Sequence, residues 1–238
     1  TPITNRPATA SMPRFDWSEP PAEPPPLFVA RSQELAGLDG HLDEALAGNG
    51  RVVFVTGGAG RGKTSLLAEF ARRTQTAHPA LIVAGGSGSA VAGVGDAYLP
   101  FREVMELLTG NLTVWRTGSA IGVEQARRLW ALLPQMTQTI LDYGPQLLEL
   151  FVPGKQLLER AAAAAPAGAR WLTTLREEVA RRQRAPGAWE QTAVFGQFTS
   201  VLHHLAQKRP LLLTLDDLQW LDAASIGLLF HLGRRLAG

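Results

Sequence analysis

A glycine-rich stretch with a single lysine has the residue types and the spacing needed to bind phosphate groups. It follows the apolar run Val52–Val55 and fits the pattern G-x-x-x-x-G-K-[ST], with Gly57, Gly62, Lys63 and Thr64 at the fixed positions. Glycines let the backbone curl so that successive N–H groups can point at phosphate oxygens. The pattern predicts that the Lys63 ammonium contacts the β- and γ-phosphates of a nucleotide and that the Thr64 hydroxyl binds Mg²⁺.

The elements on either side of this loop must hold it at the end of a sheet. Val52–Val55 is predicted to be a buried strand, and a helix is expected from about Lys63 to Thr76, with its positive end facing the phosphates. The alternative is a glycine-rich turn that only resembles the motif. A chance match of this kind is disfavoured, because the chain has only three lysines and one of them falls at the lysine position of the motif. The predicted nucleotide-binding residues of the loop are Gly57, Gly58, Gly60, Gly62, Lys63, Thr64 and Ser65.

An acidic pair after a second apolar run can supply the carboxylates that the phosphate-binding loop lacks. Leu211–Leu215 is predicted to be a buried strand that ends in Asp216 and Asp217. A carboxylate at the tip of a buried strand can hold Mg²⁺ or its water, and a second one can polarise an attacking water molecule. We therefore expect Asp216 to be a metal ligand together with Thr64, and Asp217 to act in catalysis with Lys63. An acid pair that only caps the next helix is the alternative, and it is disfavoured beside an intact phosphate-binding loop.

The composition indicates a globular protein and excludes several kinds of chemistry. With 45% hydrophobic and 18% charged residues, a chain of 238 residues can bury a substantial core in one domain. It has no cysteine, which excludes disulfides, thiolate zinc sites and cysteine nucleophiles. A net charge of +2 gives little support for nucleic acid as a partner. The sequence shows no membrane span and no signal pattern, so we expect no membrane partner and a cytoplasmic location.

The order of segments predicts a linker followed by one domain. Residues 1–26 contain half of the 16 prolines and are predicted to be an extended linker between domains. Because the chain begins with Thr1, we expect it to be a piece of a longer one. Residues 27–238 are predicted to form the phosphate-binding domain. Apolar residues at helical spacing predict a helix that starts at Ser32 and stops at Gly48.

Further elements are expected on both sides of a long helical region. A second buried strand is predicted at Ala80–Ala84, followed by a glycine loop, and a helix is expected to open at Pro100. Residues from about 121 to 207 are predicted to be almost wholly helical. After the acidic pair, Asp222 is expected to cap the next helix, and Trp220 is expected to pack rather than to contact nucleotide.

The helical region contains arginines that could contact a phosphate backbone. Glutamates are interleaved with them, so a solvated helix face is the favoured interpretation. The last helix of the region has an apolar stripe that we expect to be core, and His203 and His204 lack a metal-ligand spacing. The predicted breaks are at Pro134, Gly144-Pro145, Pro153-Gly154, Pro166 and Pro186-Gly187, and the stripe is Trp189, Phe195, Phe198, Leu202 and Leu205.

The order of these motifs resembles the bacterial STAND branch of the AAA-like P-loop ATPases. These are multidomain signalling ATPases that include large LuxR-type regulators. The resemblance covers about residues 27–238 and rests on Phe28–Leu35, on the glycine-rich loop and on Leu215–Asp222. Its most specific part is the acid pair followed by Gln219 and Trp220.

The resemblance also implies a fold and further site residues. In the family the first element usually reads Phe-Val-Gly-Arg-Glu and lies beside the adenine, which implicates Val29 and Arg31 in nucleotide binding. Ala30 and Ser32 depart from that pattern. The implied fold class is α/β, an ASCE or AAA-like three-layer sandwich with a parallel sheet and a large helical insert.

The resemblance implies a particular order of strands. In this branch a later strand lies between the strand before the phosphate loop and the strand that bears the acids. No further strand is predicted after the helix that follows Asp222, so the C-terminal part of the domain is expected to be missing. Val52–Val55 and Leu211–Leu215 should then lie two strand spacings apart, roughly 9–10 Å. We expect a piece with such a gap to fold poorly alone and to hydrolyse ATP feebly.

The resulting hypothesis is an ATP-binding, slowly hydrolysing switch module of a multidomain regulatory ATPase. It is expected to use ATP or ADP with Mg²⁺, to be closed with ADP and often a homo-oligomer with ATP. An effector domain upstream and a sensor or helical repeats downstream are its expected partners. One alternative is an origin-recognition-like DNA-handling AAA ATPase, although we expect no DNA contact by this piece. The other is a P-loop small-molecule kinase, which the residues after the acid pair disfavour.

Overall fold

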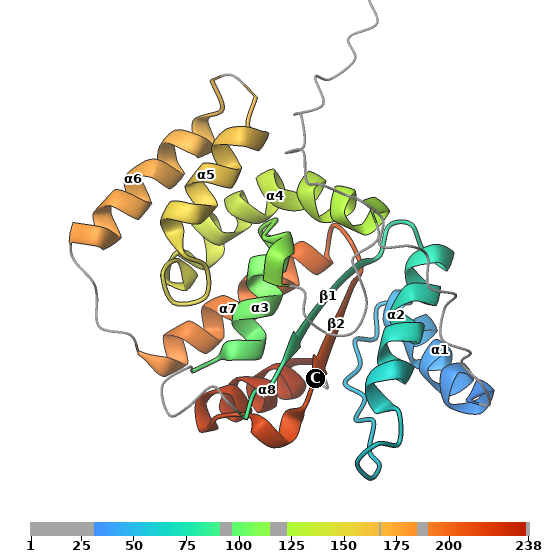
Figure 1. Ribbon diagram of the computed structural model, residues 1–238. Coiled ribbons are helices and arrows are strands. Elements are labelled where there is room, and N and C mark those ends of the chain that lie inside the picture. Colours follow the sequence, from blue (N-terminus) through green and yellow to red (C-terminus); the bar gives the residue numbers. More distant parts are fainter. Residues whose placement is uncertain (1–30, 91–96, 115–122, 167, 185–189, 237–238) are drawn as a thin grey trace, which may run out of the picture.

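Two parallel strands and the helices on both sides of them make up the described part of the chain (Figure 1). The computed structural model describes residues 31–90, 97–114, 123–166, 168–184 and 190–236. The predicted linker, residues 1–26, lies outside the described residues. The elements in order are α1 (Ser32–Leu46), α2 (Lys63–Ala77), β1 (Ile82–Ser87), α3 (Leu99–Leu108), η1 (Leu112–Val114), α4 (Val123–Tyr143), η2 (Pro145–Leu147), α5 (Gly154–Ala164), α6 (Arg170–Arg184), α7 (Gln191–Ala206), β2 (Leu211–Asp216), η3 (Leu218–Trp220) and α8 (Ala223–Leu236).

The two strands come from distant parts of the sequence and pair in register. Ile82 lies opposite Leu211 at one end of the ladder, and Ser87 lies opposite Asp216 at the other. Because the strands are parallel, their carboxyl ends meet at the same edge of the sheet. The predicted metal ligand Asp216 therefore lies beside the last residue of β1.

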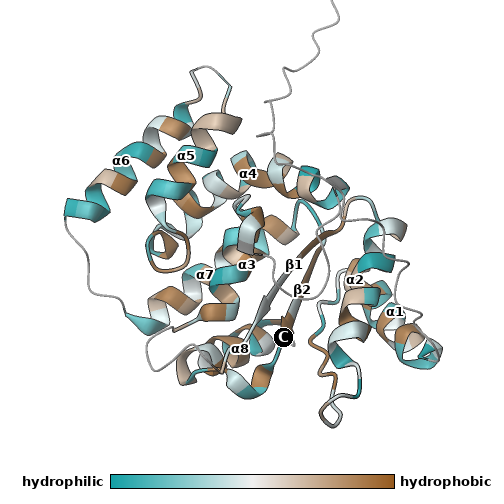
Figure 2. Cartoon of the chain, viewed as in Figure 1, coloured by the Kyte–Doolittle hydropathy of each residue, from teal (hydrophilic) through white to brown (hydrophobic). Residues whose placement is uncertain are grey.

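Each face of the sheet is covered by a separate apolar core. Side chains alternate along a strand, so Ile82 and Ala84 pack into the larger core with α3, α4 and α7, whereas Leu81 and Val83 pack against α1 and α2. Figure 1 shows the strands between these two groups of helices, and Figure 2 shows apolar colour along β2 and much polar colour on the outlying α6. The layers hold the carboxyl edge of the sheet near the start of α2.

The predicted strand at Val52–Val55 is wrong, because these residues have no regular secondary structure. Val52, Val53 and Phe54 are 41%, 41% and 60% exposed. An extended segment becomes a strand only when its backbone groups pair with a neighbour, and β1 and β2 pair with each other instead. Residues 52–55 and β2 do not pair with each other, which agrees with the expected strand order. The expected distance between them, two strand spacings, stays a prediction.

The second predicted strand exists but extends further than the sequence indicated. It was expected to end at Ala84, and the glycines after it were expected to form a loop, yet β1 continues to Ser87. Gly86 explains the difference, because a Cβ atom there would lie 2.0 Å from the Pro100 carbonyl oxygen. The glycine lets the strand pass directly against the first turn of α3. That helix is confirmed, and the apolar residues that predicted it, Phe101, Val104, Leu107 and Leu108, are fully buried.

The helical region is confirmed as α4 to α7, but the predicted break at Pro134 is wrong. Pro134 lies inside α4, where proline costs about 3 kcal/mol. Its neighbours Leu133 and Met136 are fully buried, and two such side chains contribute about 3–6 kcal/mol. Packing therefore outweighs the lost backbone hydrogen bond. The breaks at Gly144-Pro145, Pro153-Gly154 and Pro166 are confirmed, whereas Pro186-Gly187 lies outside the described residues.

The apolar stripe of the last helix in this region is confirmed as core. Phe198 and Leu205 are fully buried in α7, and Phe195 and Leu202 are each 8% exposed. Trp189 lies outside the described residues. Among the helices that the structure describes, none is long and apolar enough to cross a bilayer.

Candidate functional site

The glycine-rich loop leads directly into a helix. Gly60 and Gly62 have φ values of 69° and 70°, in the left-handed region that favours glycine. Gly62 occupies the N-cap position of α2, which starts at Lys63, and no side chain caps this end. The backbone N–H groups of the first turn therefore remain available to an anion at the positive end of the helix. The local sequence thus produces the loop-to-helix geometry that the motif predicts.

The Lys63 side chain curls back over this loop. Its ammonium Nζ donates hydrogen bonds to the carbonyl oxygens of Gly57 and Gly58, at 3.0 and 3.1 Å. A Cβ atom placed on Gly57 or Gly60 would meet no other atom within 4 Å, so the space next to the loop is open. A half-buried cation beside an open glycine backbone fits a phosphate chain.

The two predicted metal ligands touch each other. The Thr64 hydroxyl donates a hydrogen bond of 2.6 Å to Asp216 Oδ2, although the two residues are 152 positions apart in the sequence. Thr64 comes from the first turn of α2 and Asp216 from the last residue of β2, so the contact depends on how the sheet packs against α2. Both atoms are hard oxygen donors, the kind that Mg²⁺ prefers.

Asp217 follows β2 directly and is exposed. Its φ of 52° places it in the left-handed region, which aspartate tolerates better than most residues. Its carboxylate accepts a hydrogen bond from the Gln219 amide at 2.9 Å, and the Ser87 hydroxyl lies 3.5 Å from the other oxygen. The catalytic role assigned to Asp217 stays a prediction.

Three polar residues at this edge were not found from the sequence. They are Ser87, Gln219 and Glu103, whose carboxylate accepts the backbone N–H of Ser87 at 2.8 Å. Ser87 was assigned to a loop after β1, although the residue that ends a parallel strand lies at the carboxyl edge. Gln219 marked the family resemblance but had no role. No sequence pattern marked Glu103, since its approach to Ser87 depends on how α3 packs against β1.

Arg31 lies beside the phosphate-binding loop, and the contact with the adenine that the resemblance implies stays a prediction. Its guanidinium donates a hydrogen bond to the Arg61 carbonyl oxygen and lies 3.7 Å from the position of a Cβ atom on Gly62. α1 begins directly after Arg31, so the helix fixes where this side chain starts. Val29, the other predicted contact, lies outside the described residues.

Asp222 caps α8, as predicted. Its carboxylate accepts the backbone N–H groups of Ala224 and Ser225 at 2.9 Å each, the Ser225 hydroxyl, and the Tyr98 N–H at 3.2 Å. Partial burial raises the pKa of Asp222, but the hydrogen bonds from Ser225, Tyr98 and Ala224 together lower it by more. The lowered pKa means that folding favours the charged carboxylate.

Replacing the capping residue should destabilise the fold at neutral pH and much less in acid. We expect Asp222→Ala to lower the free energy of unfolding by about 1 kcal/mol at pH 7. Because the folded pKa lies below the unfolded one, this contribution is present above the unfolded pKa and is lost as the pH falls through the folded pKa. Urea unfolding of both proteins across that range measures the difference. A difference that stays constant into acid would contradict the charged cap.

The prediction that Trp220 packs into the protein is wrong. Its side chain is 53% exposed at the end of η3. Its Cβ lies 3.3 Å from where a Cβ atom would lie on Gly88, the residue after β1. The short 3-10 turn after β2 leaves more than half of the side chain exposed.

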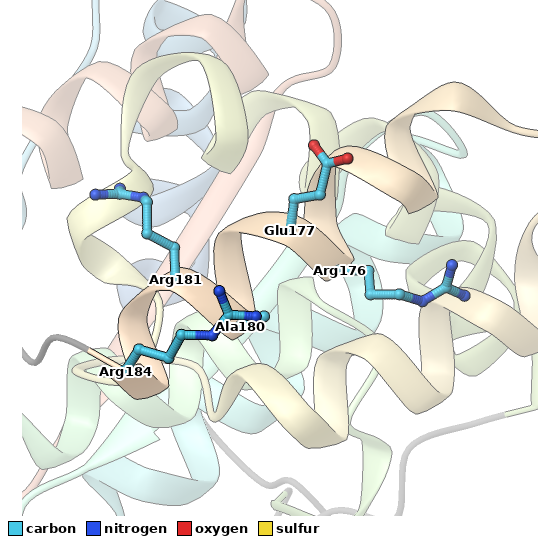
Figure 3. A pocket seen from close by; sticks show the side chains of 5 residues that line it. All are labelled: Arg176, Glu177, Ala180, Arg181 and Arg184. Carbon is cyan, nitrogen blue, oxygen red and sulfur yellow. The ribbon is translucent and has the colours of Figure 1, made fainter.

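A surface hollow on α6 lies away from these residues. It is lined by Arg176, Glu177, Ala180, Arg181 and Arg184, all from one helix, and Figure 3 shows their side chains spread along its outer face. In Figure 1, α6 and α2 lie on opposite sides of the sheet. The charged residues that line it are exposed, which supports a solvated helix face, whereas the pair of Arg182 with Glu178, at 2.8 Å, is largely buried. The hollow has none of the loop geometry that phosphate binding needs.

The described residues contain no group of three or more histidine, cysteine or acidic side chains that could hold a metal ion. His203 and His204 lie in α7 as ordinary helix residues. The donor pair of Thr64 and Asp216 is sufficient for Mg²⁺ only if the ion takes its other ligands from water and a phosphate chain, which is its usual behaviour in nucleotide sites. The residues present therefore fit Mg²⁺ brought in with a nucleotide.

Taken together, the glycine loop, the helix that starts at its lysine and the strand-end carboxylate on its threonine have the arrangement that a P-loop motif predicts. The chain belongs to the AAA ATPase domain family, whose model matches residues 27–237. Membership implies ATP binding and hydrolysis, and the mixed α/β fold with a small parallel sheet is consistent with a partial domain of this kind. No curated protein and no solved structure matched the chain.

Proposed function

We propose that this chain is the ATP-binding and slowly hydrolysing switch module of a multidomain regulatory ATPase of the STAND type. The observation that carries the proposal is the 2.6 Å contact between the Thr64 hydroxyl and Asp216 Oδ2. It joins the end of the phosphate-binding loop to the acidic end of β2, and these two oxygens are the ligands that a nucleotide-bound Mg²⁺ requires.

Each residue of the site has a separate task in this proposal. Lys63 exchanges its two loop carbonyls for oxygens of the β- and γ-phosphates. The N–H groups of the glycine loop and of the first turn of α2 hold the remaining phosphate oxygens. Arg31, beside the loop, contacts the nucleotide from the side of α1. Asp217, at the exposed edge next to the metal ligand, orients and polarises the attacking water.

Thr64 and Asp216 would hold Mg²⁺ brought in with the nucleotide, and the ion would supply positive charge that neutralises the charge developing on the phosphates. The chain's own part is to hold Thr64 and Asp216 in place before the ion arrives. Thr64 is held by α2 and Asp216 by its ladder with Ser87. Both ligands therefore stand on regular elements, which limits how far either oxygen can move.

The finer fold is also proposed, a three-layer AAA-like sandwich with a further strand between residues 52–55 and β2. Two observations support it. Val52, Val53 and Phe54 are exposed, and every residue of β2 is only half-buried although most are leucine. Apolar residues beside an open strand edge are what a missing neighbour leaves. Residues 1–238 alone should then hydrolyse ATP feebly, whereas the full-length protein should turn it over.

A switch needs partner domains that receive and send the signal. We infer that the domain, residues 27–238, works between an effector domain joined through the linker at 1–26 and a sensor or helical-repeat domain. It is closed with ADP and associates with further copies when ATP is bound. Support for this part comes from the order of motifs, above all the acid pair followed by Gln219 and Trp220.

Magnesium dependence of nucleotide binding tests the proposal most directly. In the full-length protein we expect Mg²⁺ to tighten ADP binding by roughly tenfold or more, and Asp216→Asn to remove most of that gain, because loss of even an outer-shell partner of a metal ligand typically costs about 10- to 100-fold and Asp216 is assigned as a ligand itself. Titration calorimetry with and without Mg²⁺ measures both. Asp142→Asn, the same change at an exposed residue of α4, is the matched control.

The possible results separate the parts of the proposal. If wild-type protein binds neither ADP nor ATP with Mg²⁺, the proposed function is wrong. If Asp216→Asn keeps the full magnesium effect, nucleotide binding stands but the assignment of Asp216 to the metal fails. A change in Asp142→Asn equal to that in Asp216→Asn would show that the effect is not local.

A further inference from the structure

The backbone of Asp217 is fixed by short contacts. Its N–H donates to Asp216 Oδ1 at 2.8 Å, and its carbonyl oxygen accepts the Trp220 N–H at 2.9 Å, which closes the 3-10 turn. On the β1 side, a Cβ atom on Gly88 would lie 2.4 Å from the Asp217 carbonyl oxygen, so the turn packs directly on the end of that strand. The turn cannot shift toward β1 without moving backbone.

The direction of the Asp217 carboxylate is a separate matter, because the side chain can rotate on a fixed backbone. Two side chains reach it. The Gln219 amide donates to Oδ1 at 2.9 Å, a normal hydrogen bond, whereas the Ser87 hydroxyl lies 3.5 Å from Oδ2, at the long limit. Among the described residues, Gln219 thus makes the main side-chain contact that sets the rotation of this carboxylate.

The geometry points to Gln219 as the positioning residue of Asp217. Its amide holds Oδ1 and thereby leaves Oδ2 on the side of Ser87, the last residue of β1, whose hydroxyl is 3.5 Å away. An amide is suited to this task, since it donates a hydrogen bond without adding charge beside Asp216. This inference rests on the proposed function, in which Asp217 orients the attacking water. In this role Gln219 acts through the Asp217 carboxylate.

A double-mutant cycle in the full-length protein tests this role. We expect Gln219→Leu to lower the single-turnover rate of ATP hydrolysis by roughly 10- to 100-fold, the usual cost of losing an outer-shell partner, while the Kd for ATP with Mg²⁺ stays within about twofold. In the Asp217→Asn background, Gln219→Leu should cause no further loss, because its effect passes through Asp217. Gln219→Glu keeps the shape but removes the N–H donor, and it should slow hydrolysis as well.

A readout independent of activity comes from the nucleotide-free protein. The side-chain amide resonances of Gln219, identified by their absence in Gln219→Leu, should shift in Asp217→Asn if the hydrogen bond exists. Gln183→Leu and Gln183→Glu, at an exposed residue of α6, are the matched controls and should match wild type. Thermal unfolding of each variant identifies any general loss of structure.

Three results would overturn the inference while wild-type turnover stands. They are a wild-type rate in Gln219→Leu, a wild-type rate in Gln219→Glu, and an equal further loss when Gln219→Leu is added to Asp217→Asn. Absence of turnover in wild-type full-length protein would instead contradict the proposed function on which the inference rests.

Discussion

Lys63→Ala is expected to remove most of the affinity for ATP and ADP, by about 100-fold or more. The Lys63 ammonium is the cation that lies over the glycine loop, and its two present partners are carbonyl oxygens that a phosphate chain would replace. Each charge-assisted hydrogen bond contributes about 1.5–3 kcal/mol, and every 1.4 kcal/mol is tenfold in affinity. Titration calorimetry with ADP and Mg²⁺ measures the loss directly.

The chain offers a matched control for this change. Lys155 is exposed at the start of α5, and Lys155→Ala should leave the affinity unaltered. Arg61 is a further cation of the loop, but it occupies a variable position of the motif. Equal ADP affinity in wild type and Lys63→Ala would contradict both the assignment of Lys63 and the phosphate-binding loop itself.

The loop and its helix could be predicted because their structure is local. Gly60 and Gly62 adopt the left-handed values that glycine favours, and α2 starts at the lysine of the motif. The Asp222 cap is local in the same sense, since it bonds the second and third residues of its own helix. In such cases the residues that determine the structure lie within a few positions of each other.

The elements that could not be predicted depend on partners far away in the sequence. Val52–Val55 has the composition of a buried strand, but a strand also needs a neighbour with which to pair. β1 continues through its glycines because Gly86 lies against the Pro100 carbonyl, and α4 continues through Pro134 because the residues around it are buried. Apolar patterns in one stretch do not contain that information.

Some residues of the candidate site could be predicted from local patterns, and others could not because they depend on distant contacts. The acids of β2 were predicted from their place after an apolar run, and the structure brings Asp216 to Thr64. Ser87 and Gln219 were missed, because their approach to Asp217 depends on the β1–β2 ladder and on the turn after β2. Thr64 contacts Asp216, whereas the Asp217 side chain contacts Gln219 and Ser87. Binding and chemistry should therefore be separable by substitution.

Asp217→Asn is expected to lower ATP turnover in the full-length protein by roughly 100-fold or more, the range for losing a general base, while ATP still binds. The amide is isosteric with the carboxylate and can still contact Gln219, but it cannot accept a proton from water. Binding should survive because no hydrogen bond joins Asp217 to Lys63 or Thr64 in the described part of the chain.

Single-turnover hydrolysis and calorimetry on the Asp217→Asn protein, with Asp142→Asn as the control, measure the turnover and the ATP affinity. Wild-type turnover in Asp217→Asn would mean that another group orients the water, and a parallel loss of ATP affinity would mean that Asp217 belongs to the binding site.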